Sequence, residues 1–314
     1  MREYKGKYQK DPKHNRYANN DRHPEDIQHG KKKSVYTMLS AVVAVIIGTI
    51  YSIFAYVETG TLIPSAELID GLPTFRFVDV GQGDCVLVTY QGEAVLVDAG
   101  PKSSGEKTAE YVSMYSPHVD YFFVTHPHED HMGGAADVLK AVSVDYLVMS
   151  ELVTDEEFYV EAVEAAKEQG TEIIYLTDAA EYDTGNISAQ VYDLFDFFSD
   201  DYNNSSLFIK ITAEDTTLLI TGDAETEEEE YALEKYGQTL DCDILKVGHH
   251  GSRSSSSEEF LNTVTPEIAV ISCGKNNSYG HPTSEVLKRL KKADAVIYRT
   301  DTDGTVILRG EKAV

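Results

Sequence analysis

Three histidines and two carboxylates occupy six consecutive positions within THPHEDHMGG, residues 125–134. Imidazole nitrogens and carboxylate oxygens are ligands that zinc and other divalent transition ions accept. His126 and His128 can converge on one ion from a loop, and Asp130 and His131 can face a second ion about 3.5–4 Å away. The alternative interpretation is a polar surface turn, but three histidines in six residues are rare by chance. The stretch therefore predicts a metal site.

One segment seldom completes a metal site, so further ligands are expected at other strand ends. The motif TGD (221–223) follows an apolar run and places Asp223 where it can bridge two ions. The motif VGHHGS (247–252) follows another apolar run and supplies His249 and His250. Either motif alone is weak, because strands often end in Gly-Asp and histidine pairs are often structural. Together with the first cluster, they predict a site assembled from three segments.

The elements that must position these residues are apolar runs alternating with helical patterns. Strands are predicted at FRFVDV, CVLVTY, AVLVDAG and YFFVTH, and a hairpin at 206–223 is predicted to turn at Glu214-Asp215. Helices are predicted at 106–115, 156–169, 225–236 and 284–291. The strands CDILKVG, IAVISCG and AVIYRT complete the second half. This pattern predicts two mostly antiparallel sheets packed together, with helices on their outer faces.

Charge and hydropathy divide the 314-residue chain into parts. Residues 1–33 contain ten basic and five acidic residues, and they are predicted to form a disordered cytoplasmic tail. Residues 34–57 are predicted to form a transmembrane signal anchor, since 34–56 contain no charge. Lys31-Lys32-Lys33 precedes this stretch, so the positive-inside rule places the main domain outside the cell. A cleaved signal peptide is the alternative, which the long polar tail disfavours. Residues 58–72 read as a linker.

The body of the protein is strongly acidic. After the tail is subtracted, 17 basic and 48 acidic residues remain in 34–314, a net charge of −31. Such a surface repels polyanions at long range, which argues against nonspecific binding of duplex DNA through a basic face. The three cysteines, Cys85, Cys242 and Cys273, are widely spaced and lie in apolar runs, so no disulfide partner is predicted.

Eight segments in fixed order make the chain resemble the metallo-β-lactamase superfamily, and within it the extracellular hydrolase domain of ComEC-type competence proteins. The resemblance spans about residues 73–309, and it is carried by FVDVGQGDCVLV (77–88), VLVDAG (95–100), THPHEDHMGG (125–134), NNSSLFIKI (203–211), LLITGD (218–223), LKVGHHGSRSSSSEEFL (245–261), ISCGKNNSYGHP (271–282) and YRTDTDGTV (298–306). It implies an α/β fold, an αββα sandwich over 73–314. The uncharged stretch predicts one transmembrane helix before this domain.

The resemblance also implies a ligand set. His126 and His128 would hold metal 1, Asp130, His131 and His249 would hold metal 2, and Asp223 would bridge them. His250 is the alternative to His249. The third metal-1 histidine of the superfamily is absent, and Asn203-Asn204 stands in its place. Asn204 is therefore a further candidate ligand, and because an amide oxygen is a weak, hard ligand, the two ions are expected to be Zn or Mn.

Two residues outside these motifs have open roles. Asp84, in GQGD, either approaches the metals or stabilises its turn. His281, in YGHP, either donates to a leaving or developing oxyanion or orders its loop.

The function expected from these features is that of a single-pass, membrane-anchored extracellular phosphodiesterase or nuclease that uses a metal-bound hydroxide. Asp130 or Asp223 would orient the water and accept its proton, and His281 would assist the leaving group. The substrate would be single-stranded DNA or an envelope polymer with phosphodiester links. The alternatives are a metal-binding accessory module with little turnover and a lactone or ester hydrolase.

Overall fold

The structure, a computed structural model, describes residues 71–192, 194 and 202–310. The predicted tail, the predicted anchor and all but the last two residues of the predicted linker lie outside these ranges. Among the described residues, no helix is both long enough and apolar enough to cross a bilayer.

Two seven-stranded sheets form the centre of the domain. The strands of the first sheet, in spatial order, are β14 (Val306–Arg309), β1 (Thr74–Phe77), β2 (Val86–Tyr90), β3 (Glu93–Val97), β4 (His118–Phe123), β5 (Ser143–Ser150) and β6 (Glu172–Leu176). Those of the second are β13 (Val296–Arg299), β12 (Ile268–Ile271), β11 (Ile244–Lys246), β10 (Thr216–Ile220), β9 (Phe208–Ala213), β8 (Ile187–Tyr192) and β7 (Ala180–Asp183).

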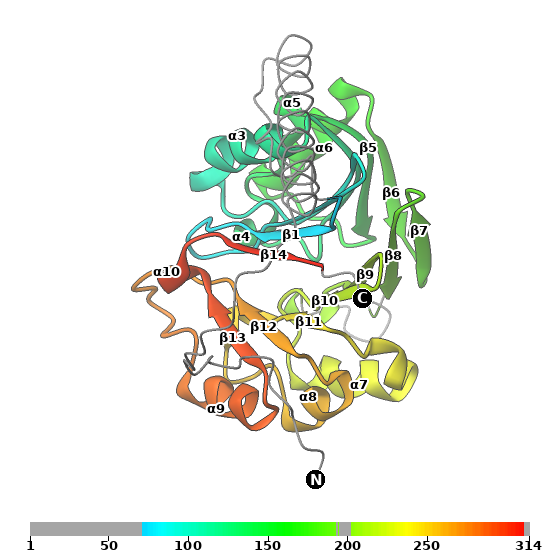
Figure 1. The fold of residues 1–314 in the computed structure, drawn as a ribbon. Coiled ribbons are helices and arrows are strands. Elements are labelled where there is room, and N and C mark those ends of the chain that lie inside the picture. The colour runs from blue at the N-terminus through cyan, green and yellow to red at the C-terminus, as the bar shows by residue number, and fades with distance from the viewer. Residues whose placement is uncertain (1–70, 193, 195–201, 311–314) are drawn as a thin grey trace, which may run out of the picture. The chain divides into compact units, whose positions relative to one another are not determined.

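Helices cover the outer face of each sheet, so the layers run helix, sheet, sheet, helix (Figure 1). The first sheet carries α3 (Gly105–Tyr115), α5 (Ala135–Ala141) and α6 (Glu157–Gln169). The second carries α7 (Thr226–Tyr236), α8 (Glu258–Val264) and α9 (Ser284–Lys292). The short elements are α4 (Glu129–Met132), α10 (Thr300–Asp303), η1 (Lys102–Ser104), η2 (Asn203–Ser205), η3 (Gly237–Leu240) and η4 (Gly248–Gly251). The domain is thus the αββα sandwich that the resemblance implies.

Three apolar cores match these layers. The middle core lies between the sheets and contains Phe75, Val95, Phe123, Ile209 and Ile220, all at most 1% exposed. One outer core joins the first sheet to its helices, and the other joins the second sheet to α7, α8 and α9. Central strands such as β3 contribute to cores on both faces, which explains why their sequences are continuous apolar runs rather than alternating ones. Cys85, Cys242 and Cys273 are buried in these cores as free thiols.

Local patterns predicted several of these elements closely, but they did not predict β5, β7, β14 or α8. The hairpin turns between β9 and β10 at Glu214-Asp215, as expected. The four predicted helices appear as α3, α6, α7 and α9, with ends shifted by at most one residue. Side-chain caps fix two of the described helices, because Thr283 accepts a hydrogen bond from the Val286 amide and Ser257 accepts one from the Phe260 amide.

The prediction of mostly antiparallel sheets was wrong for half of each sheet. Strands β14, β1, β2 and β3 pair antiparallel, but β3 to β6 pair in parallel. The second sheet repeats this division, with β7 to β10 antiparallel and β10 to β13 parallel. The reason is connectivity, because a strand that returns through a covering helix comes back in the same direction. Carboxyl ends of parallel strands meet at one edge, where ligands commonly bind.

Candidate metal centre

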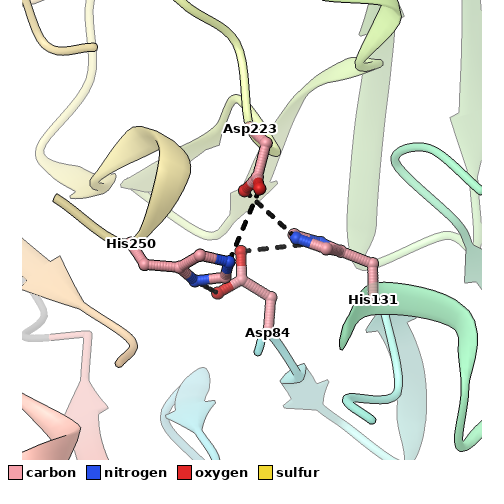
Figure 2. Close-up of side chains that lie close together, drawn as sticks. All are labelled: Asp84, His131, Asp223 and His250. Atoms are coloured by element: carbon pink, nitrogen blue, oxygen red, sulfur yellow. Dashed lines mark ion pairs between the residues drawn. The ribbon is translucent and has the colours of Figure 1, made fainter. Parts of the chain in front are cut away.

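Four side chains from four segments form a buried group at this edge (Figure 2). Asp84 comes from the loop between β1 and β2, and His131 comes from α4, just after β4. Asp223 follows β10, and His250 follows β11 in η4. One ligand atom from each lies within 4.8 Å of the others, and all four residues are buried. We call Asp84, His131, Asp223 and His250 the buried cluster.

Asp223 lies between the two imidazoles of the cluster. Its Oδ1 is 3.1 Å from His131 Nε2, and its Oδ2 is 3.5 Å from His250 Nε2. Asp84 faces the other nitrogen of each ring, since its Oδ1 is 3.3 Å from His250 Nδ1 and its Oδ2 is 3.8 Å from His131 Nδ1. The two carboxylates thus have different relationships to the same rings. Asp223 faces Nε2 of both rings, and Asp84 faces Nδ1 of both rings.

Hydrogen bonds at the Nδ1 atoms leave Nε2 of each ring as the nitrogen that could bind a metal ion. His131 Nδ1 is 2.8 Å from Asp98 Oδ2, and Asp98 also accepts bonds from the backbone and hydroxyl groups of Thr125, each at 2.8 Å. His250 Nδ1 is 3.1 Å from the carbonyl oxygen of Ser272, which can only accept. Metal-ligating histidines usually donate their second ring N–H to a carboxylate or carbonyl in this way.

The histidine of the GHHG motif that enters the cluster is His250, and His249 lies beside it. His249 Nε2 is 3.7 Å from Asp223 Oδ2, while its Nδ1 is 3.3 Å from Glu225 Oε1. Both histidines have positive φ, 47° and 53°, which is uncommon for residues other than glycine. The turn is held by the His249 amide, which donates to Gly222 O, and by the Ser255 hydroxyl, which donates to Gly248 O. Because of this left-handed turn, the side chain of His250 enters the buried cluster, while Nδ1 of His249 faces Glu225.

His126 and His128 form a separate pair beside the cluster. His126 Nε2 and His128 Nδ1 are 3.0 Å apart, close enough to share one ion. Neither of the two groups of three or more metal-binding side chains found among the described residues contains this pair. Asn204 Oδ1 accepts a hydrogen bond from the Glu225 amide at 3.0 Å, so its oxygen supports the turn after Asp223. The His131 ring lies next to the pair, with its centroid 4.2 Å from that of His126.

Asp130 and His281 lie nearer to solvent. Asp130 Oδ2 is 3.1 Å from His250 Nε2, and its side chain is 31% exposed, compared with 4% for Asp223 and 1% for Asp84. The His281 ring contacts the His249 ring edge to face, with centroids 5.7 Å apart. The backbone of His281 is held by both groups of the Asn277 amide, at 3.0 and 2.6 Å. Asp130 is thus the most open of the carboxylates that touch the cluster.

The charged groups of the cluster shift one another's pKa values. Burial alone would lower the pKa values of His131 and His250, but Asp223 and the other nearby carboxylates outweigh it and raise both pKa values well above the ordinary value. Burial would likewise raise the pKa of Asp223, but His250 and His131 hold that pKa well below its usual range. In contrast, burial and the charge of His131 lower the pKa of His126. The metal-free protein thus balances buried carboxylates with protons on two imidazoles.

The side chains present fit divalent metal ions. His131 Nε2, Asp223 Oδ1 and both carboxylate oxygens of Asp84 are buried and have no partner with hydrogen-bond geometry. Such groups are costly to bury unless something satisfies them. A cation on the Nε2 side of the rings would satisfy two of these atoms, and it would replace the protons that the imidazoles of His131 and His250 now retain.

Two supporting residues lie outside the predicted ligand set. Asp98 lies within VLVDAG (95–100), a motif that entered the interpretation only through the family resemblance, and the available signal was a carboxylate directly after a buried strand. Lys246 is fully buried and its ammonium group contacts the Asp84 carboxylate. The feature of the sequence that could have indicated this role of Lys246 is a lysine inside an apolar run.

Known proteins resemble this chain along most of the described domain. The sequence model of the metallo-β-lactamase superfamily matches residues 78–275. ComE operon protein 3 of Bacillus subtilis is 33% identical over 267 residues, which covers 76% of this chain and 33% of the relative. Competence protein ComA of Neisseria gonorrhoeae is 32% identical over 235 residues, covering 73% and 31%. The chain therefore spans about a third of the length of these relatives.

Among solved structures, CmlA, a diiron β-hydroxylase from Streptomyces venezuelae, superposes with a TM-score of 0.52 at 12% identity. The match covers 76% of this chain and 54% of that protein. At this identity, the likeness shows a shared fold alone.

Proposed function

This chain belongs to the metallo-β-lactamase superfamily and is a relative of ComEC-type competence proteins, and we propose that it is a membrane-anchored phosphodiesterase that cleaves single-stranded DNA outside the cell. The observation that carries the proposal is the buried cluster, whose unsatisfied nitrogen and oxygen atoms suit two divalent ions, Zn or Mn. The names of the curated relatives, which are competence proteins, favour DNA over an envelope polymer as the substrate.

The proposed ligand set differs from the sequence expectation at one residue. His126 and His128 would hold the first ion, and Asp130, His131 and His250 would hold the second, with Asp223 between them. His250 replaces His249 because its Nε2 faces both Asp130 and Asp223, whereas His249 Nδ1 faces Glu225. When bound, divalent ions would supply an acidified water and neutralise charge on the attacked phosphate.

The chain's own residues would then orient the reactants. Asp130 is exposed enough to meet a water and can accept its proton, while Asp98 keeps the His131 ring in place. Burial and the nearby His249 and His250 lower the pKa of His281, so this ring is neutral near neutral pH. A neutral ring can donate one hydrogen bond to the leaving oxygen of a phosphodiester. His281 Nδ1 is buried and has no hydrogen-bond partner in the structure, so it has that capacity.

A second candidate function is a metal-binding accessory module with little turnover. The observation that favours it is that the His126–His128 pair belongs to neither group of three or more metal-binding side chains found among the described residues. A lactone or ester hydrolase is the remaining alternative, since the same centre would polarise a carbonyl.

The test is to purify the full chain in detergent, measure its bound metals, and assay it with Mn²⁺ and with Zn²⁺. The substrates are bis-(p-nitrophenyl) phosphate, linear single-stranded DNA, poly(glycerol phosphate) and a lactone. We expect turnover of the small diester and of DNA, abolished by His128→Ala and by Asp223→Ala. Asp215→Ala is the matched control, because Asp215 is exposed in the turn before β10, at the opposite end of that strand from Asp223. Bound metal without turnover would favour the accessory module, and turnover of the lactone alone would favour the third candidate.

The membrane anchor and the outward orientation are proposals of their own. They rest on the uncharged stretch 34–56 and on the three lysines before it. Of two reporters fused to the C-terminus, the one that functions outside the cytoplasm should be active, and the one that requires the cytoplasm should be inactive. Activity of a reporter that requires the cytoplasm would reverse the orientation.

A further inference from the structure

A cavity of about 400 Å³ lies next to the metal centre, and nothing in the proposed chemistry uses it. It is bounded by the loop that follows β1, by one face of α3 and by the turn before β14. Its walls include Asp79, Val80, Lys107, Thr108, Tyr111 and Thr305. We call this cavity the α3 groove. Its volume lies in the range of pockets that hold small ligands.

The groove and the buried cluster share one loop. Gly81 lines the groove, and Asp84, three residues later, belongs to the cluster. Three residues of chain span at most about 11 Å, since consecutive Cα atoms are about 3.8 Å apart. A DNA strand covers that distance in a few nucleotides, because the rise is about 3.4 Å per nucleotide on each strand of a duplex. The groove therefore begins within the length of a few nucleotides from Asp84.

Contacts at both ends hold this loop in place. The Asp79 amide donates to the Thr305 hydroxyl at 3.0 Å, and Gln82 Oε1 accepts from the Gly274 amide at 3.0 Å. A Cβ on Gly83 would come within 2.3 Å of the Asp130 carbonyl oxygen, so the loop packs directly against α4. The groove therefore has a fixed position relative to Asp130 and the cluster.

One polar atom in the groove lacks a partner. Thr108 is 1% exposed, and its Oγ1 has no hydrogen-bond partner in the structure. A buried hydroxyl in this state costs free energy, and a ligand in the groove would satisfy it. This hydroxyl points to an occupant that carries a hydrogen-bonding edge.

The other walls indicate what kind of group that is. Val80 and Tyr111 offer an apolar and an aromatic surface, while Asp79 adds a carboxylate that disfavours a bare phosphate. A nucleobase has both an apolar face, which stacks on aromatic side chains, and a polar edge. Lys107 supplies the charge that a phosphate next to the base requires.

We propose that the α3 groove is a nucleotide subsite that holds one base of a single-stranded DNA substrate next to the scissile phosphate. The base lies against Tyr111 and bonds the Thr108 hydroxyl, and Lys107 binds the adjoining phosphate. The inference rests on the proposed function, and it adds the substrate's contacts away from the metals. It also explains how a body of net charge −31 can bind DNA without a basic face.

The test measures binding rather than cleavage. The full chain, loaded with Mn²⁺ in detergent, is titrated into a short fluorescent oligodeoxynucleotide with phosphorothioate links, which resists hydrolysis. We expect Tyr111→Ala to weaken binding about tenfold, the size of one base–aromatic stacking contact. Thr108→Val, which is nearly isosteric, should weaken it several-fold. Lys107→Gln should reduce the slope of log K against log salt by about one.

A set of oligonucleotides with one abasic residue at successive positions identifies the contact itself. One abasic position should weaken binding by the wild-type protein about tenfold and should cause no further loss with Tyr111→Ala. Tyr175→Ala is the matched control, because Tyr175 is an exposed tyrosine on the edge strand β6. Unfolding midpoints of all variants show whether each one folds. If Tyr111→Ala does not fold, the results for Thr108→Val and Lys107→Gln decide.

Several outcomes would overturn the subsite. The first is that every abasic oligonucleotide binds as tightly as the intact one. The second is that the groove variants weaken the binding of poly(glycerol phosphate) as much as they weaken the binding of DNA. The third is that the protein does not bind DNA. The result is separable from the proposed function. Base-dependent binding without hydrolysis keeps the subsite and rejects the nuclease. Hydrolysis of DNA without base dependence keeps the nuclease and rejects the subsite.

Discussion

The ammonium group of Lys246 contacts the carboxylate of Asp84, a member of the buried cluster, and both side chains are fully buried. Lys246 also donates to the Val247 carbonyl oxygen at 2.9 Å. Burial would raise the pKa of Asp84, but Lys246 and His250 outweigh it and lower that pKa. Asp84 therefore stays ionised on the Nδ1 side of both imidazoles. A buried charge of this kind persists only with a partner, and Lys246 is that partner.

Removing the lysine should therefore destabilise the metal-free protein. Lys246→Met leaves Asp84 as an uncompensated buried charge, a change that typically costs about 3–5 kcal/mol in the free energy of unfolding. Adding Asp84→Asn should restore part of this loss, because the unpaired charge disappears. Urea unfolding of chelator-treated protein measures both values. Lys210→Met, on β9, is the control, and additive effects of the two cluster substitutions would show that the pair is not coupled.

The two adjacent histidines should behave differently. His250→Ala removes a nitrogen that faces both Asp223 and Asp130, so metal affinity and diester turnover should fall by at least about a hundredfold. His249→Ala should cost less than about tenfold, since His249 contacts Glu225 on its Nδ1 side. Metal content and turnover of the purified variants decide between them. A larger loss for His249→Ala would return the ligand role to His249.

Metal binding should release protons. The pKa values of His131 and His250 are raised well above the ordinary value, so in the metal-free protein both rings keep a second proton at neutral pH. An ion must displace these protons, and its apparent affinity should therefore rise with pH until the pH exceeds both pKa values. Calorimetric titration with Mn²⁺ in buffers of different ionisation enthalpy counts the protons released. Heats that are identical in all buffers would contradict this charge balance.

Glu229 should make stability depend on pH. It lies fully buried on α7, where it accepts hydrogen bonds from the Ser256 and Ser257 amides of the loop after His250. Burial raises its pKa from 4.5 to about 7. The folded protein thus retains a proton that the unfolded chain loses, so this contribution to stability is present below pH 4.5 and is lost as the pH rises to about 7.

A shift of this size corresponds to about 3 kcal/mol. Glu229→Gln should remove this pH dependence, as measured by urea unfolding of chelator-treated protein across the range. Glu230→Gln, an exposed neighbour on the same helix, is the control and should keep the slope. Parallel profiles for Glu229→Gln and the unsubstituted protein would contradict the assignment.

The sequence by itself determined the family and many of the elements, including the four helices α3, α6, α7 and α9. Local signals decide these features: turn residues at Glu214-Asp215, apolar runs for central strands and helical periodicity for α3 and α6. The resemblance to the metallo-β-lactamase superfamily is confirmed by the match over residues 78–275. The assignment of His126, His128, Asp130, His131 and Asp223 as metal ligands stays a prediction, and the structure brings these residues to one edge of the sheets.

Only the tertiary structure decided which neighbouring groups face the centre. His249 and His250 are chemically identical, and it is the left-handed turn at both residues that directs Nε2 of His250 toward Asp223 and Asp130. Asp84 and Lys246 are far apart in the chain, and their pairing depends on how the loop after β1 packs against the end of β11. The sequence could name the chemistry because side-chain types carry it. It could not select among adjacent candidates, because side-chain direction depends on backbone dihedral angles and long-range packing.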